Sequence, residues 1–151
     1  MADRTGSGKR DDDERGRIGS RHEARERALS LLYEAETKSV TADDVVDDLP
    51  IEPDEFTAVL CQGVTEHAEE IDELLTRFAK NWNLARMPAL DRAILRMAVF
   101  ELAHLHEVPR NVVINEAVEL AKRYSTDESG RFVNGMLARI ADDVRGTERP
   151  G

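Results

Sequence analysis

Residues 88–105 have the sequence PALDRAILRMAVFELAHL, which indicates the helix around which the others pack. Pro88 suits the first turn of a helix, because the N–H that it lacks would have no partner there. Apolar side chains then surround most of the helical cylinder instead of forming one stripe. A helix that is apolar nearly all round is buried among other elements. We therefore predict a central helix here.

Helical spacing continues on the N-terminal side of this stretch. Apolar residues between positions 24 and 35 recur at the spacing of one helix face. Thr41 and Asp44 are spaced as a capping box for a short helix over 41–49. The apolar stripe from Phe56 to Trp82 predicts one long helix, with a bend as an alternative.

Two more amphipathic helices follow Pro109. One apolar face spans 113–124 and the next spans 132–144, and Ser125 and Glu128 are spaced as a capping box between them. No convincing strand pattern remains. The sequence thus predicts an all-α fold, a compact bundle of about six or seven helices.

Asn134-Gly135 would signal a β-hairpin if alternating residues flanked it. The flanking residues repeat with the helical period instead, so we reject the hairpin. Gly135 and Gly63 are interpreted as points of close approach between helices.

The charge is unevenly distributed along the 151 residues. The net charge is −10, which argues against simple non-specific nucleic-acid binding. Residues 15–27 nevertheless carry five arginines and two glutamates, whereas residues 28–151 carry 13 basic and 24 acidic side chains. This pattern predicts a localised anion contact on an acidic body, which leaves acidic surface for a basic protein partner.

The composition divides the chain into three parts. Residues 1–19 are rich in glycine and charge and predict a disordered tail, 20–146 a helical domain, and 147–151 a short flexible C-terminus. The lone cysteine, Cys61, excludes an intramolecular disulfide and lies in an apolar helical pattern, which favours a buried core residue. The polar start and the lack of a long apolar run predict a cytoplasmic protein that does not enter a membrane.

Enzymatic and metal-dependent functions find little support. No phosphate-binding loop, zinc-finger spacing or nucleophile elbow is present, and the paired carboxylates are typical of solvated helix faces. His104 and His106, flanked by Glu101 and Glu107, are candidate metal ligands, but the two histidines are about 200° apart around a helix. We predict a non-catalytic protein without a cofactor or metal.

Two basic clusters point towards RNA. Arg21 and Arg25 are one helical turn apart at the rim of an apolar face, near a helix N-terminus where acidic residues would be favoured. Lys122, Arg123 and Arg131 lie close in sequence to Tyr124 and Phe132, and single-stranded RNA needs both cations and flat rings. From the residues alone, RNA binding and a plain solvated face both remain open.

Motifs along residues 20–145 resemble those of the transcription antitermination factor NusB family. They are Arg21-x-x-Ala24-Arg25-x-x-Ala28-Leu29-x-x-Leu32-Tyr33, Asp91-Arg92-Ala93-Ile94-Leu95-Arg96, Val113-Ile114-Asn115-Glu116-Ala117-Val118 and Phe132-Val133-Asn134-Gly135. The resemblance implies two small helical subdomains. It also implies binding to boxA RNA of ribosomal-RNA transcripts together with NusE, a small-subunit ribosomal protein, and action with transcribing RNA polymerase and other Nus factors.

The resemblance also implies site residues. The expected RNA contacts are Arg17, Arg21, His22, Arg25, Lys122, Arg123, Ser129, Arg131 and Phe132, and Phe132 could equally serve the core. Glu101, Asn115 and Glu116 match family motif positions and are expected to bind a partner, with burial as helix-tying residues as the alternative for Asn115 and Glu116.

Other functions were weighed beside this one. A similar helical domain precedes the catalytic part of certain rRNA cytosine methyltransferases, so a detached RNA-targeting domain is one alternative. A protein-only scaffold is another. A homodimer that hides the basic corner until RNA or NusE competes is a further hypothesis, prompted by the many apolar faces.

Overall fold

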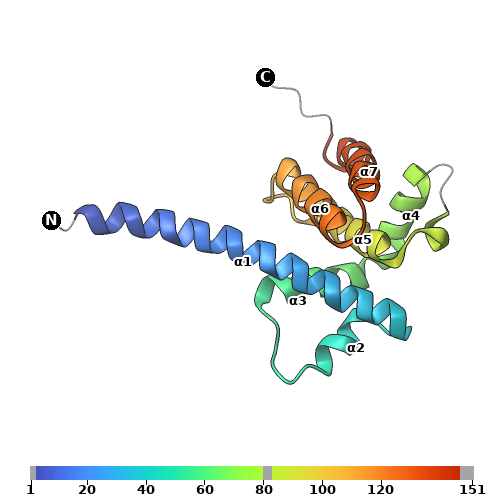
Figure 1. Ribbon diagram of the computed structural model, residues 1–151, viewed down its shortest axis with the longest axis horizontal. Coiled ribbons are helices and arrows are strands. Elements are labelled where there is room, and N and C mark those ends of the chain that lie inside the picture. Colours follow the sequence, from blue (N-terminus) through green and yellow to red (C-terminus); the bar gives the residue numbers. More distant parts are fainter. Residues whose placement is uncertain (1–2, 80–82, 147–151) are drawn as a thin grey trace.

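The structure, a computed structural model, describes residues 3–79 and 83–146, with side chains from Ser20 onward. This part of the chain contains seven α-helices, one short 3-10 helix and no strand (Figure 1). The elements are α1 (Asp3–Lys38), α2 (Ala42–Asp47), α3 (Glu55–Glu66), α4 (Ala68–Ala79), η1 (Leu84–Arg86), α5 (Ala89–His104), α6 (Arg110–Tyr124) and α7 (Asp127–Arg145). The all-α prediction is confirmed.

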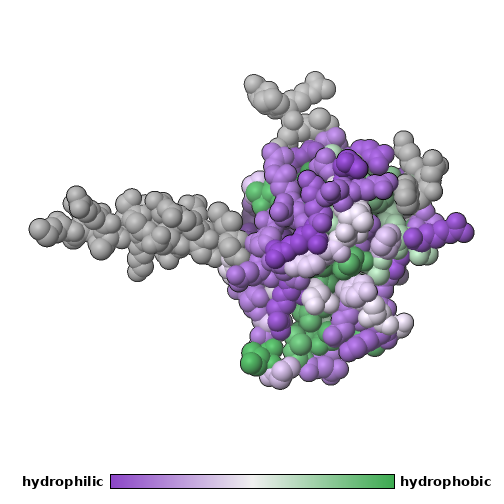
Figure 2. Space-filling model, in the orientation of Figure 1, coloured by the Kyte–Doolittle hydropathy of each residue, from purple (hydrophilic) through white to green (hydrophobic). Residues whose placement is uncertain are grey.

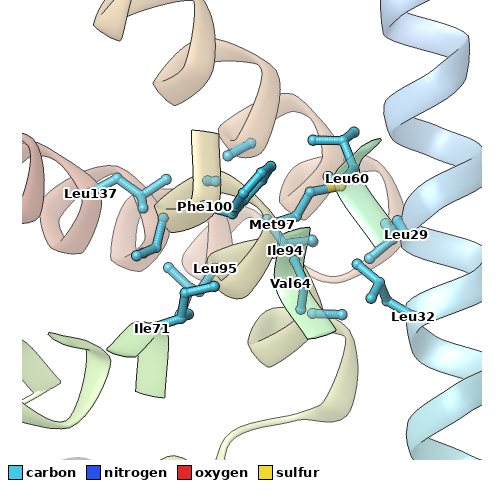
Figure 3. Packing of buried hydrophobic residues seen from close by; sticks show 14 of the residues in the cluster. Leu29, Leu32, Leu60, Val64, Ile71, Ile94, Leu95, Met97, Phe100 and Leu137 are labelled. Atoms are coloured by element: carbon cyan, nitrogen blue, oxygen red, sulfur yellow. The ribbon is translucent and has the colours of Figure 1, made fainter. Parts of the chain in front are cut away.

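Helix α5 is the central element, as its sequence predicts. It packs against α1, α3, α4, α6 and α7. Ile94, Leu95 and Leu102 on it are fully buried, and α5 contributes to a core that extends from Leu29 on α1 to Leu137 on α7 (Figure 3). The α1–α3 group and the α4–α7 group therefore share one continuous hydrophobic core.

The predicted long helix is divided in two. α3 ends at Glu66, His67 adopts φ −107° and ψ 21°, and α4 begins at Ala68. The alternative with a bend is therefore the one that the structure contains. The end of the predicted stripe, at Trp82, lies outside the described residues, as do residues 147–151 of the predicted C-terminus.

Capping of the other helices agrees with the sequence except at one position. Thr41 and Asp44 form the predicted capping box of α2. The predicted cap of the last helix at Ser125 is wrong by one residue. Thr126 is the N-cap, because its hydroxyl accepts a hydrogen bond of 2.9 Å from the Ser129 N–H, whereas the Ser125 N–H completes α6 by donating to Ala121 O.

The two glycine predictions have opposite outcomes. A Cβ atom at Gly63 would lie 2.1 Å from Cζ of Phe100, so only glycine lets α3 approach α5 this closely. A Cβ atom at Gly135 would meet nothing within 4 Å, and the residue is exposed. The predicted close approach is confirmed at Gly63 and is wrong at Gly135.

Arg145 connects the C-terminal end of α7 with that of α5. Arg145, on the last turn of α7, donates to the carbonyl oxygens of Glu101, Leu102, Leu105 and Val108 at distances of 2.6–3.1 Å. These carbonyls lie at or just beyond the C-terminal end of α5, where backbone acceptors lack helical partners. Arg145 therefore closes the end of the central helix.

Helix α1 is described from Asp3 onward, so its backbone runs through most of the segment for which the sequence predicts a disordered tail. Its first half extends beyond the other helices (Figure 1). The division of the chain at residue 20 stays a prediction. None of the described helices is long and apolar enough to cross a bilayer. The face in Figure 2 is mostly hydrophilic, with hydrophobic residues exposed chiefly at its lower edge, near α2.

Candidate nucleic-acid interface

The first residues of α1 whose side chains the structure describes lie beside the C-terminal half of α6. Nδ1 of His22 lies 2.7 Å from Oε2 of Glu116 on α6. One turn later, Glu26 accepts a hydrogen bond from the Tyr124 hydroxyl and lies 3.5 Å from NH1 of Arg123. These contacts join the basic segment of α1 to the last turns of α6, and we call this region, with the turn that follows α6, the α1–α6 surface.

Arg25 does not belong to the exposed part of this surface. Its side chain is 3% exposed and forms a two-point ion pair with Glu101 on α5, with Nε 3.0 Å from Oε2 and NH2 2.8 Å from Oε1. The predicted phosphate contact at Arg25 is incompatible with this arrangement, because the guanidinium already has a buried partner. The expected partner-binding role of Glu101 fails for the same reason.

Burial of this ion pair disfavours the charged form of the Glu101 carboxyl. Desolvation raises its pKa, while the hydrogen bond and the charge of Arg25 act in the opposite direction. A buried ion pair of this kind fixes two helices in one register, here α1 and α5. Arg25 and Glu101 are therefore structural residues beneath the α1–α6 surface.

Arg21 remains available at the surface. Its guanidinium lies 4.6 Å from the centre of the Phe56 ring on α3, in a cation–π contact, and its side chain is half-buried. Arg21 and Phe56 line an open groove of about 500 Å³ together with Ser20, Asp54 and Leu105. The ring fixes the direction of the arginine and leaves part of it accessible to an anion.

His22 is held between two carboxylates. Nε2 lies 3.1 Å from Glu26, in addition to the Nδ1 contact with Glu116. The hydrogen bond to Glu116 raises the pKa of His22 above its usual value. His22 therefore joins α1 to α6 and is partly neutralised, so its predicted RNA contact would require exchange of these partners.

The turn between α6 and α7 presents the most exposed cations of the surface. Lys122, Arg123 and Arg131 are all exposed. The stem of Lys122 passes over the backbone of Gly130, where a Cβ atom would lie 2.7 Å from its Cγ. The absence of a side chain at position 130 thus lets Lys122 lie flat across the start of α7.

A pocket of about 200 Å³ opens at the same turn, between the start of α5 and the start of α7. Phe132 contributes a half-buried ring that also packs against the core. Asp91 is 4% exposed; its Oδ2 accepts a hydrogen bond of 2.9 Å from the Ser129 hydroxyl, while its Oδ1 has no hydrogen-bond partner. The pocket thus offers an aromatic ring, whereas the unpaired Oδ1 of Asp91 is itself buried.

This pocket revises the sequence-based site. Ser129 is nearly buried, and its hydroxyl positions Asp91, so the predicted direct contact with RNA is incompatible with its present hydrogen bond. The sequence prediction did not include Asp91 in the site. A single acidic residue in the first turn of a helix that is apolar nearly all round could have indicated it.

The remaining predicted residues lie elsewhere. Asn115 is exposed and Glu116 is bound to His22. The Arg17 side chain lies outside the described side chains.

The arrangement suits one kind of ligand. The exposed cations can pair with phosphates, and the pocket can receive a flat group against the Phe132 ring. A single-stranded nucleic acid supplies both. The only cysteine, Cys61, is buried in the core, and burial raises the pKa of its thiol to about 12.

Comparison with known proteins gives a consistent result. The sequence profile of the NusB family matches residues 22–142. The chain is 47% identical over 141 residues to the transcription antitermination protein NusB of Saccharopolyspora erythraea, covering 87% of this chain and 95% of that protein.

Solved structures show the same relationship. T. maritima NusB has 32% identity and a TM-score of 0.74, covering 82% of this chain and 91% of that one. A crystal structure of the antitermination factors NusB and NusE in complex with dsRNA contains a chain with 27% identity and a TM-score of 0.69, covering 82% of this chain and 97% of that one.

Proposed function

The chain belongs to the NusB family, and we propose that it is a non-catalytic, RNA-binding transcription antitermination factor. Its RNA would be the boxA element of ribosomal-RNA transcripts, bound together with NusE. The structure of relatives with NusE and dsRNA supports a ternary assembly of this composition.

One observation carries the proposal at the level of residues. The α1–α6 surface brings Lys122 and Arg123 together with a turn that also holds the Asp91–Phe132 pocket, while Arg21 on α1 lies beside Phe56 of α3. Phosphate contacts supply affinity, and base contacts supply specificity. A surface with both kinds of group side by side is the arrangement that a sequence-selective RNA-binding protein needs.

Each group has a distinct role in this proposal. Arg21, Lys122, Arg123 and Arg131 would neutralise phosphates along the strand. An unstacked base would enter the pocket and lie against the Phe132 ring. Arg25 and Ser129 act indirectly, since they hold the helices and the Asp91 side chain in position.

The acidic body fits a basic protein partner. The net charge of −10 opposes tight binding to RNA alone, and complementary charge favours association with a basic protein. NusE would add its own contacts to the RNA, and transcribing RNA polymerase with other Nus factors would complete the assembly in the cytoplasm. Self-association that covers the α1–α6 surface in the absence of RNA is retained as a hypothesis.

A titration of labelled boxA RNA with the purified chain tests the proposal. Fluorescence anisotropy would be measured with boxA and with a scrambled RNA, with and without NusE, at several salt concentrations. We expect a preference for boxA that increases when NusE is present. The double variant Lys122→Ala, Arg131→Ala should bind more weakly, and its log–log salt slope should decrease by about 0.7 for each lost phosphate contact.

A matched control separates this surface from general electrostatics. The double variant Arg77→Ala, Arg139→Ala removes the same charge from two exposed positions on α4 and α7. It should bind boxA nearly as the unaltered chain does. Equal losses in both double variants would show that only net charge matters. Equal binding of boxA and scrambled RNA under all conditions would favour the protein-only scaffold.

A further inference from the structure

A cluster of three metal-binding side chains lies at the corner between α3 and α4. His67 ends α3, Glu70 lies on the first turn of α4, and His104 is the last residue of α5. One potential ligand atom from each lies within 4.8 Å of the other two. In the part of the chain that the structure describes, no other group of three such residues meets this criterion.

The distances are close to those of a coordination site. Oε2 of Glu70 lies 3.3 Å from Nδ1 of His67 and 3.1 Å from Nε2 of His104. Bond lengths of 2.0–2.2 Å at a tetrahedral zinc ion place neighbouring ligand atoms about 3.3 Å apart. The three ligand atoms are therefore close enough to share one ion once one of the stacked rings turns so that both nitrogens face it.

The two imidazoles are already held in position. Their rings are stacked with centres 3.8 Å apart, and the centre of the Phe100 ring lies 5.6 Å from that of His104 and 5.9 Å from that of His67. Phe100 is itself fixed against α3 by the missing side chain of Gly63. The Phe100 ring thus limits the orientations of both imidazoles, and one of them turns out of the stack when the two nitrogens converge on an ion.

The cluster is also open to solvent on one side. The side chains of His67, Glu70 and His104 are 34%, 49% and 30% exposed. An ion can therefore enter from solution, and water can occupy its remaining coordination position. Two imidazole nitrogens and one carboxylate oxygen are the donor set of several zinc sites and suit Zn²⁺ far better than Mg²⁺.

We propose that His67, Glu70 and His104 form a zinc-binding site that clamps the α3–α4 corner to the C-terminal end of α5. Sequence spacing could not predict this site, because His67 and His104 are 37 positions apart. They meet only through the break between α3 and α4. The metal site weighed from the sequence, at His104 and His106 with Glu101, is not formed, since Glu101 is paired with Arg25. The new site is independent of RNA binding.

Zinc titration by calorimetry, with the metal-free full chain in excess Mg²⁺, tests this proposal. The excess Mg²⁺ occupies exposed carboxylate sites that would otherwise bind Zn²⁺ weakly. We expect one Zn²⁺ per chain, reversal by EDTA, and a higher thermal midpoint when zinc is present, because the ion binds only the folded state. His104→Gln and His67→Gln should each weaken binding by at least about tenfold.

His106→Gln and His22→Gln are the matched controls, and both should bind zinc as the unaltered chain does. Unchanged affinity in His67→Gln and His104→Gln, or the absence of a stoichiometric site, would overturn the proposal. Should a cluster variant fail to fold, NMR of the unaltered chain gives the answer. Zinc should shift the ring signals of His67 and His104, and signals that shift only at His22 or His106 would contradict the site.

Discussion

Arg25 and Arg21 are one turn apart on α1, yet the structure gives them different roles. Removing one partner of a buried ion pair leaves the other charge uncompensated, which typically costs about 3–5 kcal/mol. Arg25→Ala should therefore lower the free energy of unfolding by about that amount, because Glu101 would lose its partner. Arg21→Ala should cost only about 0.5–1 kcal/mol, from the cation–π contact with Phe56, and should weaken RNA binding.

Urea denaturation of both single variants and of the double variant Arg25→Met, Glu101→Leu checks this assignment. The double variant removes both charges and should recover most of the stability that Arg25→Ala loses. Equal stability of Arg25→Ala and Arg21→Ala would show that the buried pair contributes nothing. Sequence reasoning could not distinguish the two arginines, since the partner of Arg25 is 76 positions away.

His22 makes the contact between α1 and α6 sensitive to pH. The hydrogen bond to Glu116 raises its pKa in the folded state, so the folded protein binds the proton more tightly than the unfolded chain does. The resulting stabilisation is complete below about pH 6.5, the usual histidine value, and is lost as the pH rises through the raised folded-state pKa. His22→Gln should lack this loss in denaturation curves from pH 5.5 to 8.5. His106→Gln should retain it.

At the scale of helices, Gly63 and Gly135 provide a paired test. Gly63→Ala should destabilise the fold by about 1–3 kcal/mol, because the added methyl group overlaps the buried ring of Phe100. Gly135→Ala should instead stabilise it by about 0.5–1 kcal/mol, since the position is an open site inside α7 and alanine favours helix. Thermal and urea unfolding measure both effects. A stabilising Gly63→Ala would show that Phe100 can move aside.

The same comparison shows what the sequence can predict about elements. Periodicity identified the central α5, the short α2 and the faces of α6 and α7, because each pattern lies within one segment. It could not place the pocket or the histidine cluster, since these depend on how separate helices meet. The cap at Thr126 in place of Ser125 has a local cause: both residues can cap a helix, and α6 continues far enough to use the Ser125 N–H.

At the scale of the whole molecule, the charged side chains and the apolar core occupy different regions. The face in Figure 2 is mostly hydrophilic, whereas the core is one apolar cluster that extends from α1 to α7. Sequence reasoning predicted an acidic body with a basic corner. It missed that Glu26, Glu101 and Glu116 each approach a basic residue at that corner, which leaves Lys122 and Arg131 as its more accessible cations.

Deletion of residues 1–16 tests whether the N-terminal segment contributes to this organisation. Figure 1 shows the first half of α1 extending beyond the other helices, and the core begins only at Ala28. We expect the thermal midpoint of the shortened chain to differ by no more than about 2 °C, because no core contact is removed. The segment holds four basic and five acidic residues, so its removal should also leave the salt slope of RNA binding unchanged. A fall of several degrees on deletion would show that the segment docks on the bundle, and a reduced slope would assign it phosphate contacts of its own.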